Sequence, residues 1–508
     1  MKRIPKKAPG LFVLFGLLLI CQGAGAQTPR TLTLKQAIAI AEKQSYRILT
    51  LRENLRAAEE NLKAARGEFR TNAKLNLSTP VLRQQVTEIP VPNGLPVYNT
   101  TGTLLYRSDL SINQPLPTNG FFSLRSSLFH ERVSTLAALN RPPFKRKDFY
   151  SSVSLQFQQP LFTLNTLKTS LKKAALNYKR ALHNYKMQAA NLVYDVTQTF
   201  YNLYQAERLV EIAQEEVKER REAYKLAQNK FKAGLIPEVE AMQLGVDLAQ
   251  SRNALLVAKG NDARLADSFR QLIGLPLDEP VRVLPDLQYR EVKISVEDAV
   301  QRALKNRPEV RNKEIDVELA KIRVREVDNQ SAIKGMFSAY YNLTGISDPN
   351  LPFSSQPYDL FQSSLTDLKN RPRNKGVSFT LSIPLWDWGV NRAQVEAAKA
   401  SLEMSRLDKK EEEITIRRQI RAQVSRVREA FDRLKILDAN RTVARKSFQI
   451  SLARFDNGEI TSQELARVQD QLSQAEVNYL SALIAYKLAL ADLRRSTLYD
   501  YENETLQK

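Results

Sequence analysis

Apolar and polar residues alternate in several short segments of the chain, and this period of two predicts β-strands. In residues 152–158 Val153, Leu155 and Phe157 alternate with serine and glutamine. Residues 337–343 and 376–383 follow the same pattern. Such strands have one apolar and one polar face, which suits a barrel wall between lipid and a wet lumen but also a soluble sandwich.

Two much longer segments carry helical periodicity instead. Residues 161–233 contain neither Gly nor Pro, and their apolar stripe advances in steps of four and three, as in helices that coil on one another. At 1.5 Å per residue this segment would be about 110 Å long. Residues 390–457 are likewise free of Gly and Pro and predict a second helix of roughly 100 Å.

Each long helix is followed by a short turn centred on a glycine and then by a second helix. The first turn contains Gly234 followed by Pro237, and the second contains Gly458 followed by Thr461 and Ser462. Glycine can adopt the left-handed conformation that ends a helix, and Pro, Ser or Thr suits the start of the next one. Both segments therefore predict helical hairpins.

The chain is an internal duplication. Pro160 precedes Pro384 by 224 positions, and the same step places Phe231-Lys-Ala-Gly234 on Phe455-Asp-Asn-Gly458. The openings of the two copies, residues 32–38 and 294–300, are instead 262 positions apart. The difference of 38 residues predicts an added hairpin in the first copy, near residues 101–133.

These patterns predict the following organisation. A signal peptide covers 1–26. The first repeat, 27–290, has an opening helix, strands within 74–161 with the extra hairpin, a long helix 162–233 and a return helix 238–273. The second repeat, 291–508, has an opening helix, strands within 336–385, a long helix 389–457, a return helix 461–494 and a tail. The Gly-, Pro- and Ser-rich connection 345–375 predicts a long loop.

The N-terminus has the pattern of a secretory signal. A basic start precedes the apolar run 11–20, and Ala24-Gly-Ala26 provides a small-residue cleavage site. The one cysteine, Cys21, lies within this segment, where a lipid anchor is the alternative, although Ile20 is bulkier than a lipoprotein processing site prefers. The exported chain would then have no thiol, which suits an oxidising envelope.

The formal net charge of +21 becomes +17 when residues 1–26, with four cations and no acid, are removed. A basic balance raises a nucleic-acid partner as an alternative, but these charges are spread along helices and export makes that partner unexpected. The two histidines, His130 and His183, are far apart in the sequence, and no phosphate-binding loop or hydrolase motif occurs. We predict no enzyme activity, no metal site and no cofactor.

Together the repeats resemble the TolC family of outer membrane efflux proteins over nearly the whole exported length. The resemblance lies in the Leu-Thr-Leu-x-x-Ala-Ile opening, the corner formed by Pro384, Leu385 and Gly389, the glycine-centred turns and the order of long and return helices. It implies an α+β membrane protein, trimeric, with two structural repeats per chain and a periplasmic α-barrel of long helices continuous with an outer-membrane β-barrel. It also implies an efflux or type I secretion channel that receives substrates from an inner-membrane RND or ABC transporter through a periplasmic adaptor.

The resemblance also assigns roles to particular residues. The hairpin tips, expected to contact the adaptor, are Ala233, Gly234, Leu235, Asn457 and Gly458. Candidates for a periplasmic gate are Glu240, Glu464, Arg467 and Phe455, with the two glutamates six residues beyond each tip glycine. Arg467 stands where a second acid is typical of the family, so the match at the gate is incomplete.

Trp386 and Trp388 directly follow the strand of the second repeat and predict an aromatic belt at the membrane interface. A different class of protein remains open on the residues alone, namely a periplasmic coiled-coil scaffold or adhesin with a soluble β head. A basic, DNA-associated helical protein is a third reading, which would require the signal peptide to be wrong.

Overall fold

The computed structural model describes residues 30–90, 95–135, 144–234, 237–456, 459–502 and 505–506. The predicted signal peptide and Cys21 lie outside this part. The chain divides into two compact units, and each unit draws on both repeats. Unit 1 comprises residues up to 48, 192–291 and 427–491, and unit 2 comprises 49–191, 292–426 and 492–508.

Unit 1 is built from helices and one short parallel strand pair. Its core contains large side chains with almost no exposed surface, including Phe200, Phe269 and Tyr486. Phe200 packs edge-on against Phe269, and the Tyr486 hydroxyl donates to the carbonyl of Arg290 at 2.6 Å. Its elements are β1 (Arg30–Thr33), α1 (Leu34–Gln44), α4 (Glu238–Ile273), β6 (Val281–Leu284) and parts of α3 (Thr166–Lys232), α8 (Val390–Asp456) and α9 (Ser462–Thr497).

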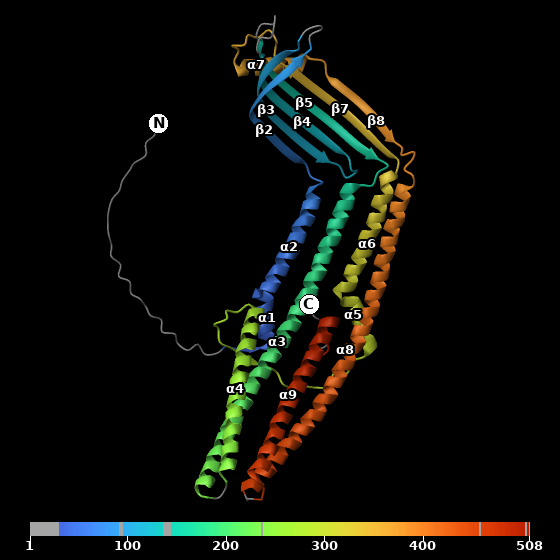
Figure 1. Cartoon of the computed structure of the whole chain (residues 1–508). Helices are drawn as coiled ribbons and strands as arrows, with labels where there is room; N and C mark the ends of the chain where they lie inside the picture. The colour runs from blue at the N-terminus through green and yellow to red at the C-terminus, as the bar shows by residue number, and fades with distance from the viewer. Residues whose placement is uncertain are drawn as a thin grey trace, which may run out of the picture. The chain divides into compact units, whose positions relative to one another are not determined.

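Unit 2 contains a six-stranded antiparallel sheet and the helices that adjoin it. The strand order is β2-β3-β4-β5-β7-β8, and Figure 1 shows the strands side by side in this order. The strands are β2 (Asn72–Ile89), β3 (Val97–Pro115), β4 (Phe121–Thr135), β5 (Phe144–Leu161), β7 (Lys334–Ile346) and β8 (Asn374–Ser382). The other elements are α2 (Tyr46–Gly67), α5 (Val296–Asn306), α6 (Pro308–Asp328), the 3₁₀ turn η1 (Asn329–Ser331), α7 (Pro357–Asn370), β9 (Tyr499–Asp500) and β10 (Thr505–Leu506).

The register of the sheet separates an apolar face from a polar face. Ile112, Leu124, Leu155 and Tyr341 stand opposite one another on successive strands. Because side chains alternate along each strand, they share one face, which we call the apolar face. Its side chains remain accessible, with Leu124 40% and Phe379 54% exposed. The opposite, polar face carries residues such as Asn113, Ser123, Gln156 and Ser378.

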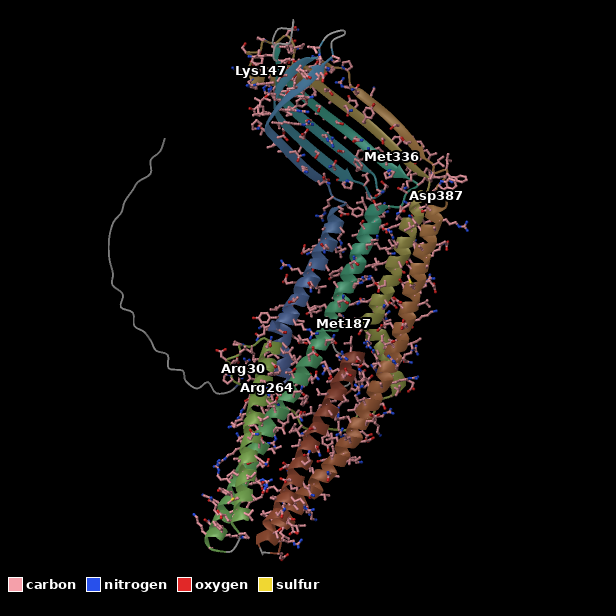
Figure 2. The ribbon with its side chains drawn as sticks, viewed as in Figure 1. Arg30, Lys147, Met187, Arg264, Met336 and Asp387 are labelled. Atoms are coloured by element: carbon pink, nitrogen blue, oxygen red, sulfur yellow. The ribbon has the colours of Figure 1, made fainter. Side chains whose placement is uncertain are left out.

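The connection after β7 differs from the predicted loop, because it contains α7. Pro357 suits the first turn of this helix. Leu360 and Ser364 are buried, and Phe361 packs edge-on against Phe149 of β5 at 5.1 Å. α7 therefore covers the apolar face at the strand ends that carry Lys147 (Figures 1 and 2).

Other element bounds also differ from the sequence prediction. The opening helix is split in both repeats, at Ser45 and at Arg307, where Pro308 begins a new helix. The last strand stops at Ser382 rather than 385, and Pro384 just beyond it has no N–H to donate to a neighbouring strand.

Candidate functional sites on the helices and the sheet

The tip of the first hairpin is a tight turn between α3 and α4. The Gly234 amide donates to the carbonyl of Phe231 at 2.9 Å, and Gly234 has a φ of 70°. Apart from its chain neighbours, no atom in the described part of the chain lies within 4 Å of a Cβ added at this position, so the glycine is needed there for its backbone angle and not for close packing. Ala233 immediately precedes it, whereas Leu235 lies outside the described residues.

The second tip contains Asn457 and Gly458, which both lie outside the described residues. Beyond it, the Thr461 hydroxyl accepts from the Glu464 amide and the Glu464 carboxylate accepts from the Thr461 amide, both at 3.2 Å. This reciprocal pair is a capping box, which satisfies two backbone donors at the start of α9. Glu464 thus has a structural role at the start of α9, and its part in a gate stays a prediction.

The remaining gate candidates are only partly described. Arg467 is exposed on the second turn of α9. Glu240 and Phe455 belong to α4 and α8, but their side chains lie outside the described part of the structure.

A charged cluster that the sequence analysis did not single out links three helices of unit 1. Arg220 of α3 lies 2.7 Å from a carboxylate oxygen of Asp470 on α9 and 4.0 Å from Asp247 on α4. Glu216, one turn earlier in α3, is 3.9 Å from the guanidinium. The Arg220 side chain is only 13% exposed, whereas that of Asp470 is 62% exposed, so the cation is largely shielded from solvent and its main partner is not.

Nothing local in the sequence marks Arg220 as special, because its partner Asp470 is 250 residues away. The repeat offers no help either, since Ala444 stands 224 positions beyond Arg220. The cluster is therefore a property of the first hairpin and α9 alone. It ties the two helical hairpins together within unit 1.

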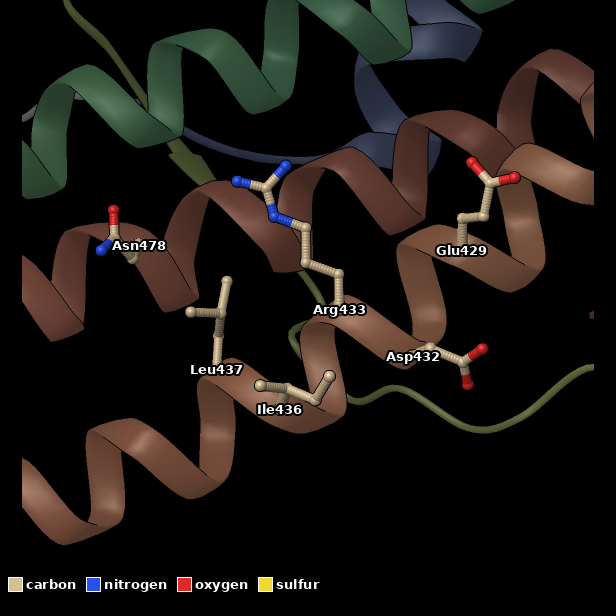
Figure 3. A pocket seen from close by; sticks show the side chains of 6 residues that line it. All are labelled: Glu429, Asp432, Arg433, Ile436, Leu437 and Asn478. Carbon is tan, nitrogen blue, oxygen red and sulfur yellow. The ribbon is translucent and has the colours of Figure 1, made fainter.

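The second hairpin is held by contacts between α8 and α9. Arg445 pairs with Glu476 at 2.8 Å, and the guanidinium of Arg441 lies over the Tyr479 ring at 3.7 Å. An open groove of about 480 Å³ is lined by residues of the same two helices (Figure 3). Its lining residues are Glu429, Asp432, Arg433, Ile436, Leu437 and Asn478.

The corner between β8 and α8 carries both tryptophans. The Asp387 carboxylate accepts from the amides of Gly389 at 2.9 Å and Asn391 at 3.0 Å, which caps α8 at this corner (Figure 2). Trp386 and Trp388 are both exposed, and their rings meet edge-on at 5.2 Å. The two rings therefore project from the end of the strand next to the helices.

Within the described residues there is no group of three or more potential metal ligands, and no helix there combines the length and apolar character required to cross a membrane. His183 lies 3.2 Å from the side-chain oxygen of Asn312, and His130 lies 3.0 Å from the carbonyl of Asp148.

Comparison with known proteins places this geometry among solved channels. A family model described as outer membrane efflux protein matches residues 127–275 and 299–497. A search of curated proteins found no match. The fold is similar to the CmeC outer membrane channel of Campylobacter jejuni, with a TM-score of 0.66, 14% identity, and coverage of 94% of this chain and 86% of that one.

Two further channels have the same fold. VceC from Vibrio cholerae aligns with a TM-score of 0.63 and 14% identity over 91% of this chain and 95% of its own. The open-state MtrE channel of Neisseria gonorrhoeae aligns with a TM-score of 0.63 and 14% identity over 91% of this chain and 88% of its own. The predicted fold class is confirmed: this is an α+β membrane protein with two repeats, of the trimeric channel class that combines a helical barrel with a β domain.

Proposed function

Because the chain belongs to the outer membrane efflux protein family, we propose that it forms the passive exit duct of a tripartite efflux or type I secretion system. Three copies would share one barrel in the outer membrane, with helices extending into the periplasm. An inner-membrane RND or ABC transporter would supply the substrate and the energy. A periplasmic adaptor would connect that transporter to the hairpin tips.

The main support for this proposal is the six-stranded sheet, which has one apolar and one polar face. Its apolar side chains are accessible over all six strands, whereas its polar face carries hydroxyl, amide and charged groups. A soluble β head would be expected to bury its apolar face in a core, but α7 is packed only on the strand ends remote from the helices. Lipid against one face and water against the other satisfy both sets of side chains.

Planar bilayer recording of the purified protein tests the exit duct. We expect discrete conductance steps from a species of trimeric mass that is extracted only with detergent. Extraction without detergent, combined with quenching of Trp386 and Trp388 by water-soluble but not lipid-borne quenchers, would instead support the scaffold or adhesin. The same quenching measurement tests the proposed position of the two rings at the membrane interface.

Adaptor docking is proposed for Ala233, Gly234 and Leu235 of the first tip and, less closely matched to the family pattern, for Asn457 and Gly458. The exposed left-handed turn at Gly234 supports this assignment, because among the described residues no atom beyond its chain neighbours lies within 4 Å of a Cβ added there. Replacing Gly234 by valine should weaken adaptor capture while leaving the trimer intact. Unchanged adaptor capture would show that the first hairpin tip is not the docking site.

An acidic ring at the periplasmic mouth is proposed for Glu240 and Glu464, with Arg467 and Phe455 nearby in sequence. The double change Glu240→Gln and Glu464→Gln should lower cation preference in reversal-potential measurements. Glutamine retains an oxygen that can accept from the Thr461 amide, so the helix cap should survive while the charge is lost. An unchanged reversal potential would show that neither glutamate contributes to an acidic ring at the periplasmic mouth.

A further inference from the structure

The two repeats contribute unequal numbers of strands to the sheet. The first repeat supplies β2, β3, β4 and β5, whereas the second supplies β7 and β8. Since β5 and β8 carry the segments matched by the 224-residue step, and β2 and β7 follow the opening helices, the hairpin β3–β4 is the addition. The sequence alone could not say whether such a hairpin joins a wall or folds over its rim.

The added hairpin is paired along both of its sides. β3 pairs with β2 from Asn72↔Asn113 to Ile89↔Val97, with one irregularity after Ser78. β4 pairs with β5 from Phe121↔Gln158 to Thr135↔Phe144 without interruption. β3 and β4 therefore occupy interior positions of the sheet, between the strands that continue into helices.

Both faces of the sheet run across the added hairpin without a break. On the apolar face Phe122 of β4 stacks on Phe157 of β5 at 4.6 Å. On the polar face the Ser127 hydroxyl donates to Asp109 at 2.5 Å, and Asn113 donates to Asn72 at 3.3 Å. A hairpin that folded into the lumen or over the rim would not need an apolar face in line with those of its neighbours.

The turn of the hairpin is fixed to the start of α3. The Asn165 side chain donates to the carbonyl of Pro117 at 2.7 Å, and the Thr166 hydroxyl donates to Asn119 at 2.7 Å. A Cβ on Gly120 would lie 2.6 Å from the carbonyl of Gln158, so the turn approaches β5 as closely as a glycine allows. The hairpin is thus anchored at the end of the sheet next to the helices.

Within the described part of the chain, the outer edges of β2 and β8 have no partner strand. We propose that these edges pair with those of neighbouring copies, so that three subunits of six strands close an 18-stranded barrel in which β3 and β4 form part of the lipid-facing wall. Without the added hairpin the same three copies would supply 12 strands. Barrel diameter grows roughly in proportion to strand number, so the hairpin widens the exit by about half.

This inference rests on the proposed trimeric channel, and cysteine labelling separates the two. The chain beyond residue 26 has no cysteine, so single substitutions report one position each. The matched neighbours are Leu110→Cys with Ser111→Cys on β3, and Leu124→Cys with Ser123→Cys on β4. Each variant is placed in proteoliposomes, and trimeric mass is verified on the same sample.

A small water-soluble maleimide should label Ser111→Cys and Ser123→Cys at least 10-fold faster than their leucine neighbours. A lipid-dissolved quencher should favour probes at 110 and 124. Equal labelling from water within each pair, in a trimer that remains embedded in the membrane, would overturn the wall position of the hairpin. Failure to form a membrane trimer would instead count against the proposed function.

The unmodified protein provides a second measurement that does not depend on any variant. End-on electron cryomicroscopy of the trimer in nanodiscs should show 18 strands around the wall. A closed wall of 12 strands, with β3 and β4 outside it, would refute the inference even if every cysteine variant folded poorly.

Discussion

Gly345 is the residue at which α7 approaches the sheet most closely. A Cβ on Gly345 would lie 2.1 Å from the carbonyl oxygen of Ser364 and 2.7 Å from the Leu368 amide. The Ser151 hydroxyl also donates to the Ser364 carbonyl, and the Ile346 amide donates to Asp367. The glycine thus allows the backbones of helix and strand to come into direct contact.

We therefore expect Gly345→Ala to separate α7 from β7 and to destabilise the protein by about 1–3 kcal/mol, as overpacking does. The temperature at which the trimer dissociates in detergent measures this effect. Gly67→Ala is the matched control, because a Cβ there meets no atom within 4 Å. An equal loss in both variants would show that the close approach at Gly345 is not the cause.

Glu207 is the residue whose titration we expect to influence stability near neutral pH. Its carboxylate accepts from the Val283 amide at 3.3 Å, while burial, aided by the nearby charge of Asp262, raises its pKa from 4.5 to about 7. A carboxyl group with a raised pKa binds more protons in the folded than in the unfolded state. Its contribution to stability is therefore lost as pH rises from about 4.5 to about 7.

The thermal midpoint of the protein should fall over this pH range, and Glu207→Gln should reduce the fall. The expected difference is on the order of 1 kcal/mol, because the group is only half-buried and water screens much of the penalty. Melting curves at pH 5 and pH 8 provide the comparison. Parallel pH profiles for the two proteins would exclude Glu207 as the source.

At the scale of elements, the Arg220 cluster is the connection between hairpins that is simplest to test. Arg220→Ala would leave three carboxylates near one another without their cation, so α4 and α9 should separate more readily. We expect a higher basal conductance in planar bilayers. The control Arg454→Ala removes an exposed cation paired with Glu459 at 3.2 Å and should have little effect. An unchanged conductance in the Arg220 variant would show that the cluster does not help to keep the channel closed.

The elements that could be predicted from sequence are those governed by local periodicity. The stripe along α3 and the alternation along β5 and β8 depend on neighbouring residues, and glycine marked both turns. α7 was predicted as loop because its helix depends on packing of Leu360 and Phe361 against the sheet. The contact between Arg220 and Asp470 could not be predicted from the sequence, because it depends on how the two separate hairpins pack.

At the scale of the whole molecule, the added hairpin offers a test by removal. Leu75 pairs with Leu110, Leu110 with Ser126, and Ser126 with Val153, so β2 and β5 already point their apolar residues to the same face. Deleting Val97–Thr135 should let β2 pair directly with β5, giving a trimer with a barrel about two-thirds as wide. End-on images measure the width, and an unchanged diameter would contradict the inferred role.

The fold class could be predicted because duplication, strand alternation and long helices occur here in the order found in the TolC family, and that resemblance implies the architecture. The strand number did not follow, because an insertion of 38 residues has the same length whether it joins the sheet or covers it. Only the register of β3 and β4 with their neighbours distinguishes these cases.

The unpaired edges of β2 and β8 have a consequence for the life of a newly exported chain. Within the described residues, a lone subunit displays two rows of backbone N–H and C=O groups without a partner strand beside an exposed apolar face, a condition that favours strand addition by other chains and fibre growth. We therefore expect an isolated subunit to be prone to edge-to-edge association until its β2 and β8 edges pair with those of neighbouring copies.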